Sequence, residues 1–243
     1  MSNYIKTLSL KSGIWLAPFL VDPASDIAKL HPEWLVKNAE GFKVHPLLDA
    51  FWPYRRHIFD IKQPEVQNYL FESIAKLIEQ DGFELIKPDF LYAPYFDPSM
   101  CAKEAGFRLH EFLKELKRRH STVHINGCGL PFVAAANVVD SLRIGPDTIA
   151  PYLENVPILG RIINNQKVRD VINIVPKRYD MGKYRNIDPD VMVCRKSLGI
   201  SEKSLTGLAQ VIKETNGNIL LGDDLAKLSE NRLQKYVYPL FLA

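Results

Sequence analysis

The chain has 243 residues, 47% of them hydrophobic, and 31 Lys and Arg stand against 28 Asp and Glu. This size and apolar content suffice for one sizeable core, and the near-neutral charge argues against a nucleic-acid partner. No apolar run reaches the roughly 18 residues of a membrane span, and the N-terminus lacks a secretory signal pattern. We therefore expect a cytoplasmic protein that binds neither nucleic acid nor a membrane.

The cysteines and histidines give no sign of a disulfide or metal framework. Cys101, Cys128 and Cys194 form no close pair and have no metal-type spacing. An odd number of cysteines without a signal pattern argues against disulfides, and the six histidines form no HExxH-like cluster. We expect no disulfide and no dedicated metal site.

Strand and helix patterns alternate along the chain. The nearly continuous apolar run at 13–21 is typical of a strand buried on both faces, and Pro64 opens an amphipathic helix that ends at Asp81-Gly82. The connection over 22–56 is too long for an ordinary loop and predicts a functional one. Further strands are predicted at 83–90, 122–125, 141–144, 191–194 and 218–221, and helices at 105–116, 131–139, 168–174, 201–216 and after 224.

This alternation predicts an α/β fold with a parallel sheet. We count about six strands, against the eight of a closed TIM (β/α)8 barrel in roughly 250 residues. No Gly-rich phosphate-binding motif follows a strand, which disfavours a nucleotide-binding open sheet. Because the chain begins almost directly on a strand, we expect residues 1–243 to form a single barrel domain that is incomplete at its N-terminus, with about strands 3–8 present.

Acidic residues follow several predicted strands, where parallel α/β folds collect their reacting groups. Asp89 comes after Lys87, Asp147 after Arg143, and Asp223-Asp224 after the last strand. Two such carboxyls could act as nucleophile and general acid/base of a retaining glycosidase, which holds them about 5–5.5 Å apart. Strand-end aspartates also cap helices, so patterning alone leaves both interpretations open, and it favours a cap and turn for Asp223-Asp224.

Four stretches together resemble the melibiase-type α-galactosidases of glycoside hydrolase family 36. They are GIWLAPF at 13–19, HPEW at 31–34, KPDFLYA at 87–93 and RIGPDT at 143–148, in the family's order. The resemblance implies a TIM-barrel domain that hydrolyses terminal α-D-galactosides with retention, through a covalent galactosyl-enzyme intermediate. It also implies that no metal or organic cofactor takes part.

The resemblance assigns roles to six residues. Asp89 would be the nucleophile and Asp147 the acid/base; the residues that would contact the sugar are Lys87, Arg143, Cys128 and Trp15. Blander interpretations stay open for three of them: Trp15 in the core, Cys128 as a small buried side chain, and Lys87 as a structural ion-pair partner.

Three departures from the family pattern matter. The family's Trp-rich and Asp-Asp strands and its N- and C-terminal β-domains have no counterpart here, Pro88 separates Lys87 from Asp89, and Asn186 is displaced by one position from an Asn-Asp-Pro-Asp motif. These departures leave as alternatives an inactive or partner-dependent fragment, an α-galactosyl transferase, or an α-N-acetylgalactosaminidase. Besides an α-galactoside substrate, the partners to consider are a second copy of the chain or a complementing N-terminal fragment.

Overall fold

The computed structural model describes residues 2–41, 43–44, 56–154, 156–183 and 186–242. The chain forms two compact units, residues 1–140 and 141–243, which are described here one after the other. Of the long connection predicted over 22–56, residues 42 and 45–55 lie outside the described part.

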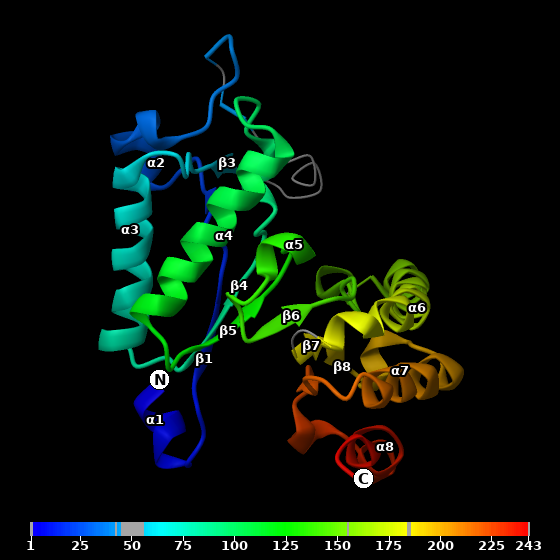
Figure 1. Ribbon diagram of the computed structural model, residues 1–243. Helices are drawn as coiled ribbons and strands as arrows, with labels where there is room; N and C mark the ends of the chain where they lie inside the picture. Colours follow the sequence, from blue (N-terminus) through cyan, green and yellow to red (C-terminus); the bar gives the residue numbers. More distant parts are fainter. Residues whose placement is uncertain (1, 42, 45–55, 155, 184–185, 243) are drawn as a thin grey trace. The chain divides into compact units, whose positions relative to one another are not determined.

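Three parallel strands form the sheet of the first unit (Figure 1): β1 (Gly13–Leu16), β4 (Leu85–Pro88) and β5 (His124–Gly127). They confirm the expected parallel pairing, with shorter bounds than predicted. The single strand predicted over 13–21 is wrong, because the chain leaves the sheet before Pro18, which has no N–H to donate to a ladder. The later part of that run is β2 (Leu20–Val21), which pairs antiparallel with β3 (His57–Ile58).

Helices α3 (Pro64–Ala75) and α4 (Ala102–Arg119) run side by side in the first unit (Figure 1). Both were predicted from their apolar stripes. The buried ring of Phe112 on α4 stacks on Phe71 of α3 at 4.6 Å between centroids and meets Phe19 edge-on at 5.2 Å. This aromatic cluster joins the two helices to the segment that follows β1. The shorter helices of this unit are α1 (Ser2–Thr7), α2 (Asp26–Leu30) and α5 (Phe132–Ala135), the last of them shorter than the helix predicted over 131–139.

The described part of the long connection packs against α3. His31 stacks on Trp34 at 4.0 Å between ring centroids, and Trp34 lies 5.5 Å from the Tyr69 ring of α3. The backbone N–H of Asp60 donates to the Trp34 carbonyl at 2.8 Å. The HPEW stretch therefore anchors the loop in the first unit.

A part-buried ion pair ties the loop after β4 to the segment after β3. The Lys62 ammonium lies 2.6 Å from Asp97 Oδ2, and the Asp97 side chain is only 1% exposed. Burial by itself would raise the pKa of Asp97, but the hydrogen bonds from Lys62 and Ser99 outweigh it and lower the pKa below its ordinary value. The loop that begins at the end of β4 is thus held by a charged anchor.

The second unit contains two parallel strand pairs: β6 (Ser141–Arg143) with β7 (Asn186–Asp188), and β8 (Val191–Met192) with β9 (Leu220–Leu221). Three of these strands were predicted. β7 was not, because it is three residues long and only its central Ile187 is apolar, which is too short a pattern to recognise.

Helices α6 (Pro157–Ile174) and α7 (Glu202–Glu214) lie side by side in the second unit (Figure 1), which ends in the short α8 (Glu230–Arg232). The Ser201 hydroxyl accepts the Ser204 N–H at 3.2 Å and so confirms the predicted cap of α7. α6 begins well before the helical stretch predicted at 168–174. Its first half leaves Ile158 and Ile162 exposed, which blurs the amphipathic pattern.

Parallel strands separated by helices in both units confirm the predicted α/β fold. Among the described helices, none combines the length and apolar character that crossing a bilayer requires.

Replacing Lys62 with Met should leave the buried Asp97 carboxylate without its cation. We expect the free energy of unfolding to fall by about 2–3 kcal/mol at neutral pH, less than for a fully buried pair because Lys62 is partly exposed. A group whose folded pKa is lowered stabilises the fold above its unfolded value, so the difference should shrink as the pH falls below the ordinary 3.8 of Asp97.

Urea unfolding of both proteins at several pH values measures this difference. Lys114→Met, which breaks an exposed pair with Glu111 at 3.3 Å, is the matched control and should cost well under about 1 kcal/mol. Equal losses in the two variants would contradict the anchoring role of Lys62.

Candidate functional site

Trp15, Lys87 and Asp89 lie on one face at the carboxyl ends of β1 and β4. Trp15 is the register partner of Lys87, and Asp89 follows two residues beyond it. Side chains alternate across a strand, and the burial of Ile86 and Pro88 assigns them to the opposite, packed face. The sheet therefore turns the three predicted site residues of this region in the same direction.

Backbone hydrogen bonds extend the ladder beyond the ends of these strands. The Asp89 N–H donates to the Leu16 carbonyl at 2.8 Å, and the Cys128 N–H donates to the Pro88 carbonyl at 2.9 Å. Pro88 is the last residue of β4, where its missing donor is tolerated. The proline thus leaves the ladder intact and still presents Asp89 and Cys128 at the ends of neighbouring strands.

Both oxygens of the Asp89 carboxylate accept a hydrogen bond. The Trp15 indole Nε1 donates to Oδ2 at 3.0 Å, and the Phe90 backbone N–H donates to Oδ1 at 2.7 Å. The Trp15 side chain packs its ring edge-on against Phe90 at 6.3 Å, yet the residue is 53% exposed, so it does not belong to the core of its unit. Trp15 therefore orients the carboxylate and keeps an open aromatic surface.

The backbone turns sharply after Asp89. Phe90 has a φ of 54°, in the left-handed region that non-glycine residues adopt at a cost of about 1–2 kcal/mol. The Leu91 N–H donates to the Cys128 carbonyl at 3.3 Å and so fixes the chain beyond the turn. Such conformations persist where the surroundings enforce them, and they are frequent at functional sites.

Cys128 is 8% exposed, so its interpretation as a small buried side chain stays open. Sequence reasoning did not include Asn126 among the site residues. Continuing the β4–β5 register from Leu85 and His124 sets Asn126 beside Lys87, and Asn126 is buried. The signal that could have found it is the polar Asn-Gly-Cys-Gly run at the end of an otherwise apolar strand.

In the second unit, Arg143 ends β6 and contacts two carboxylates. Its Nη2 lies 3.3 Å from Asp147 Oδ1, and its Nη1 lies 2.8 Å from Asp190 Oδ1. The Arg143 side chain is 6% exposed, whereas that of Asp147 is 74% exposed. A second cation, Lys167 of α6, lies 4.0 Å from Asp147 Oδ2. The predicted pair of Arg143 and Asp147 is therefore brought together, with Asp147 at the surface of this unit.

Asp190 is a residue that sequence reasoning mentioned only as part of an altered motif. It is buried, its Oδ2 accepts the Thr148 N–H at 2.7 Å, and its own N–H donates to Asp188 Oδ1 at 2.8 Å. Burial raises the pKa of Asp190, and the charge of Arg143 opposes that rise. An acid-Pro-acid run directly after a strand is the signal that could have identified it.

The acidic pair after the last strand has the structural role that was predicted. Asp224 accepts the Ala226 N–H at 3.2 Å and caps a short turn, while Asp223 Oδ1 pairs with Arg195 Nη1 at 2.7 Å. In the part of the chain that the structure covers, no group of three or more His, Cys, Asp or Glu side chains could hold a metal ion.

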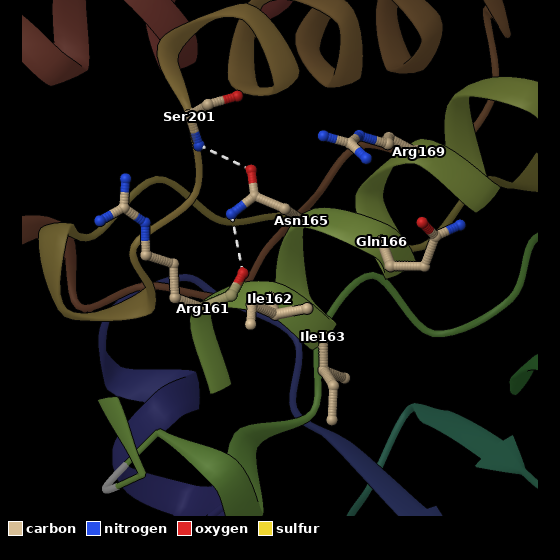
Figure 2. Close-up of a pocket in the computed structure, with 7 residues that line it drawn as sticks. All are labelled: Arg161, Ile162, Ile163, Asn165, Gln166, Arg169 and Ser201. Carbon is tan, nitrogen blue, oxygen red and sulfur yellow. Dashed lines mark hydrogen bonds between the residues drawn. The ribbon is translucent and has the colours of Figure 1, made fainter. Parts of the chain in front are cut away.

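A cavity of about 550 Å³ lies elsewhere in the second unit, lined by side chains of α6 and by Ser201. Figure 2 shows Asn165 at its centre, where its amide donates to the Arg161 carbonyl at 2.8 Å and accepts the Ser201 N–H at 3.0 Å. The lining includes no carboxylate, so this cavity offers neither an acid nor a nucleophile for glycoside hydrolysis. Asn165 instead links α6 to the start of α7.

A family model described as Melibiase matches residues 1–130, just over half of the chain. Among curated proteins, an α-galactosidase of Escherichia coli is 26% identical over 131 residues, which are 52% of this chain and 17% of that protein. An α-galactosidase of Lactobacillus acidophilus is 22% identical over 136 residues, 52% of this chain and 18% of its own length.

Solved structures give the same fold. The α-galactosidase of Thermus thermophilus, determined in complex with stachyose, superposes with a TM-score of 0.80 at 23% identity and covers 97% of this chain. This chain spans 51% of that enzyme. A GH36 α-galactosidase of Geobacillus stearothermophilus gives a TM-score of 0.65 at 15% identity, over 96% of this chain and 30% of the enzyme. The expected TIM-barrel-type fold, present in part, is confirmed.

Gly129→Ala should distort the turn that holds Asp89. Gly129 has a φ of +63°, and a Cβ there would lie 3.0 Å from Tyr92 Cδ1 and 3.4 Å from the Phe90 nitrogen. We expect a loss in unfolding free energy of about 1–2 kcal/mol from the backbone, with roughly 1–3 kcal/mol more from the clash.

Gly41→Ala is the matched control, because Gly41 has a φ of +83° and no described atom within 4 Å of an added Cβ. It should show the backbone cost alone when both variants are unfolded in urea. Equal losses would show that the contact of Gly129 with Tyr92 and Phe90 is not tight.

Proposed function

Because the chain belongs to the Melibiase family, we propose that it carries the two catalytic carboxyls of a retaining α-galactosidase, acting on terminal α-D-galactosides. The observation that supports this most directly is the carboxylate of Asp89. It stands at the end of a parallel strand, on the same face as Lys87, with one oxygen bound by the half-exposed Trp15 at 3.0 Å.

Asp89 is the nucleophile in this proposal. A nucleophilic carboxylate must be ionised and aimed, and the two N–H donors on Asp89 favour the ionised form and fix its direction. Its oxygen forms a bond to the anomeric carbon of the galactoside while the bond from that carbon to the leaving oxygen breaks. A covalent galactosyl-enzyme intermediate results.

Asp147 is the general acid and then the general base. It gives its proton to the leaving oxygen in the first step, and in the second it takes a proton from the water that attacks the same carbon. Retention requires the two carboxyls to work about 5–5.5 Å apart, and this is the distance that the proposal requires of Asp89 and Asp147. The exposure of Asp147 supports a role in which its carboxyl meets substrate and water.

Substrate contacts are assigned to the remaining predicted residues. Lys87 and Arg143 would donate hydrogen bonds to sugar hydroxyls, Cys128 would lie near the 2-hydroxyl, and the exposed ring of Trp15 would offer an apolar face to the sugar. Aromatic rings with a polar N–H suit such a site because they combine both kinds of contact.

The proposal is tested by the hydrolysis of p-nitrophenyl α-D-galactoside with Asp89→Ala and Asp147→Ala. We expect kcat to fall on the order of 10³-fold or more in Asp89→Ala, since the covalent step is lost. Added azide should restore turnover in both variants and so reveal their roles through the product. A single displacement in Asp89→Ala would give the β-galactosyl azide, and two displacements in Asp147→Ala would give the α-anomer.

Asp26→Ala, which alters an exposed aspartate of α2, is the control and should keep full activity. Identical azide products from the two variants would contradict the assigned roles. A wild-type chain without activity on this substrate would contradict the proposed hydrolysis by this chain alone and would favour the partner-dependent alternative.

A further inference from the structure

Asp190 grips the segment that carries Asp147 at two points. One of its oxygens accepts from the Arg143 guanidinium at 2.8 Å, and the other accepts the Thr148 N–H at 2.7 Å. Arg143 precedes Asp147 by one helical turn's length of sequence, and Thr148 follows it directly. Both contacts lie inside the second unit, and Asp190 and Thr148 are both buried.

The backbone around Asp190 is arranged for this grip. Asp190 has a φ of 83°, in the left-handed region that Asp and Asn tolerate better than most other residues. Its N–H is bound by Asp188 Oδ1 at 2.8 Å, and Asp188 is the register partner of Arg143 in the β6–β7 pair. The strand pairing thus fixes the position from which Asp190 reaches the loop.

The charges near Asp147 give the contact a chemical consequence. Two cations face the Asp147 carboxyl, Arg143 at 3.3 Å and Lys167 at 4.0 Å, and both favour its ionised form. A general acid must instead hold a proton until the leaving oxygen takes it. The carboxylates of Asp190 and Asp188 face Arg143 from β7 and the residues after it, and they offset its charge.

We propose that Asp190 is a positioning residue for Asp147: its carboxylate neutralises and fixes Arg143 and holds the Thr148 amide, so that Asp147 can carry the proton of the leaving group. This inference rests on the proposed function for the role of Asp147. The contacts on which it is built do not depend on that function.

Two substitutions separate the two contacts. Asp190→Asn keeps the tolerance for a positive φ and an oxygen for the Thr148 N–H, but it removes the charge that offsets Arg143. Asp190→Ala removes both contacts. Asp180→Asn, which changes an exposed aspartate paired with Lys183 at 2.6 Å, is the matched control.

The kinetic test compares a poor and a good leaving group in the full chain. In Asp190→Asn, kcat/KM for methyl α-D-galactoside should fall roughly tenfold or more, and that for p-nitrophenyl α-D-galactoside less than about threefold, because p-nitrophenolate leaves with little protonation. The basic limb of the pH profile should move to lower pH. Lys167→Met, which removes the second cation, should move that limb to higher pH.

Amide hydrogen exchange at Thr148 gives a measurement that needs no activity. Exchange should be unchanged in Asp190→Asn and at least about tenfold faster in Asp190→Ala, where the acceptor is lost. Unchanged exchange in Asp190→Ala would overturn the inference whatever the activity. Equal losses on both substrates with an unmoved pH limb would also overturn it, because they would reveal a purely structural role. A wild-type chain that cleaves neither galactoside would instead contradict the proposed function.

Discussion

The candidate nucleophile depends on the backbone ladder that joins β1, β4 and β5 and continues past their ends. The bonds from Asp89 N–H to the Leu16 carbonyl and from Cys128 N–H to the Pro88 carbonyl set the height of each residue at the sheet edge. A register slip of one residue would turn Asp89 toward the packed face. Everything that holds the carboxylate, including the indole of Trp15, presupposes this register.

The two units treat their acidic groups differently. In the first, Asp89 is bound by neutral N–H donors, which favour a carboxylate without cancelling its charge. In the second, Asp147 faces cations whose effect is offset by the buried carboxylate of Asp190. One environment suits a group that must stay ionised, and the other suits a group that must exchange a proton. The same pairing of unlike environments separates the two carboxyls in retaining glycosidases generally.

Local pattern predicted the elements that are long and regular. The helices around Val66 and Leu109 followed from their apolar stripes, and the cap at Ser201 followed from its side-chain chemistry. Short elements were harder, because three residues such as those of β7 contain less than two periods of a strand pattern. The early apolar run was read as one strand because hydrophobicity alone does not register the break at Pro18.

By itself the sequence determined the order of strands and helices, the family motifs, and the acidic residues that follow the strands. It determined these because helix periodicity, strand hydrophobicity and motif spacing are properties of neighbouring residues. Only the tertiary structure decided that Trp15 binds Asp89, 74 residues further on, and that Asp190 lies against Arg143. Such contacts follow from strand register and chain crossover, which bring distant residues together and leave no trace in local pattern.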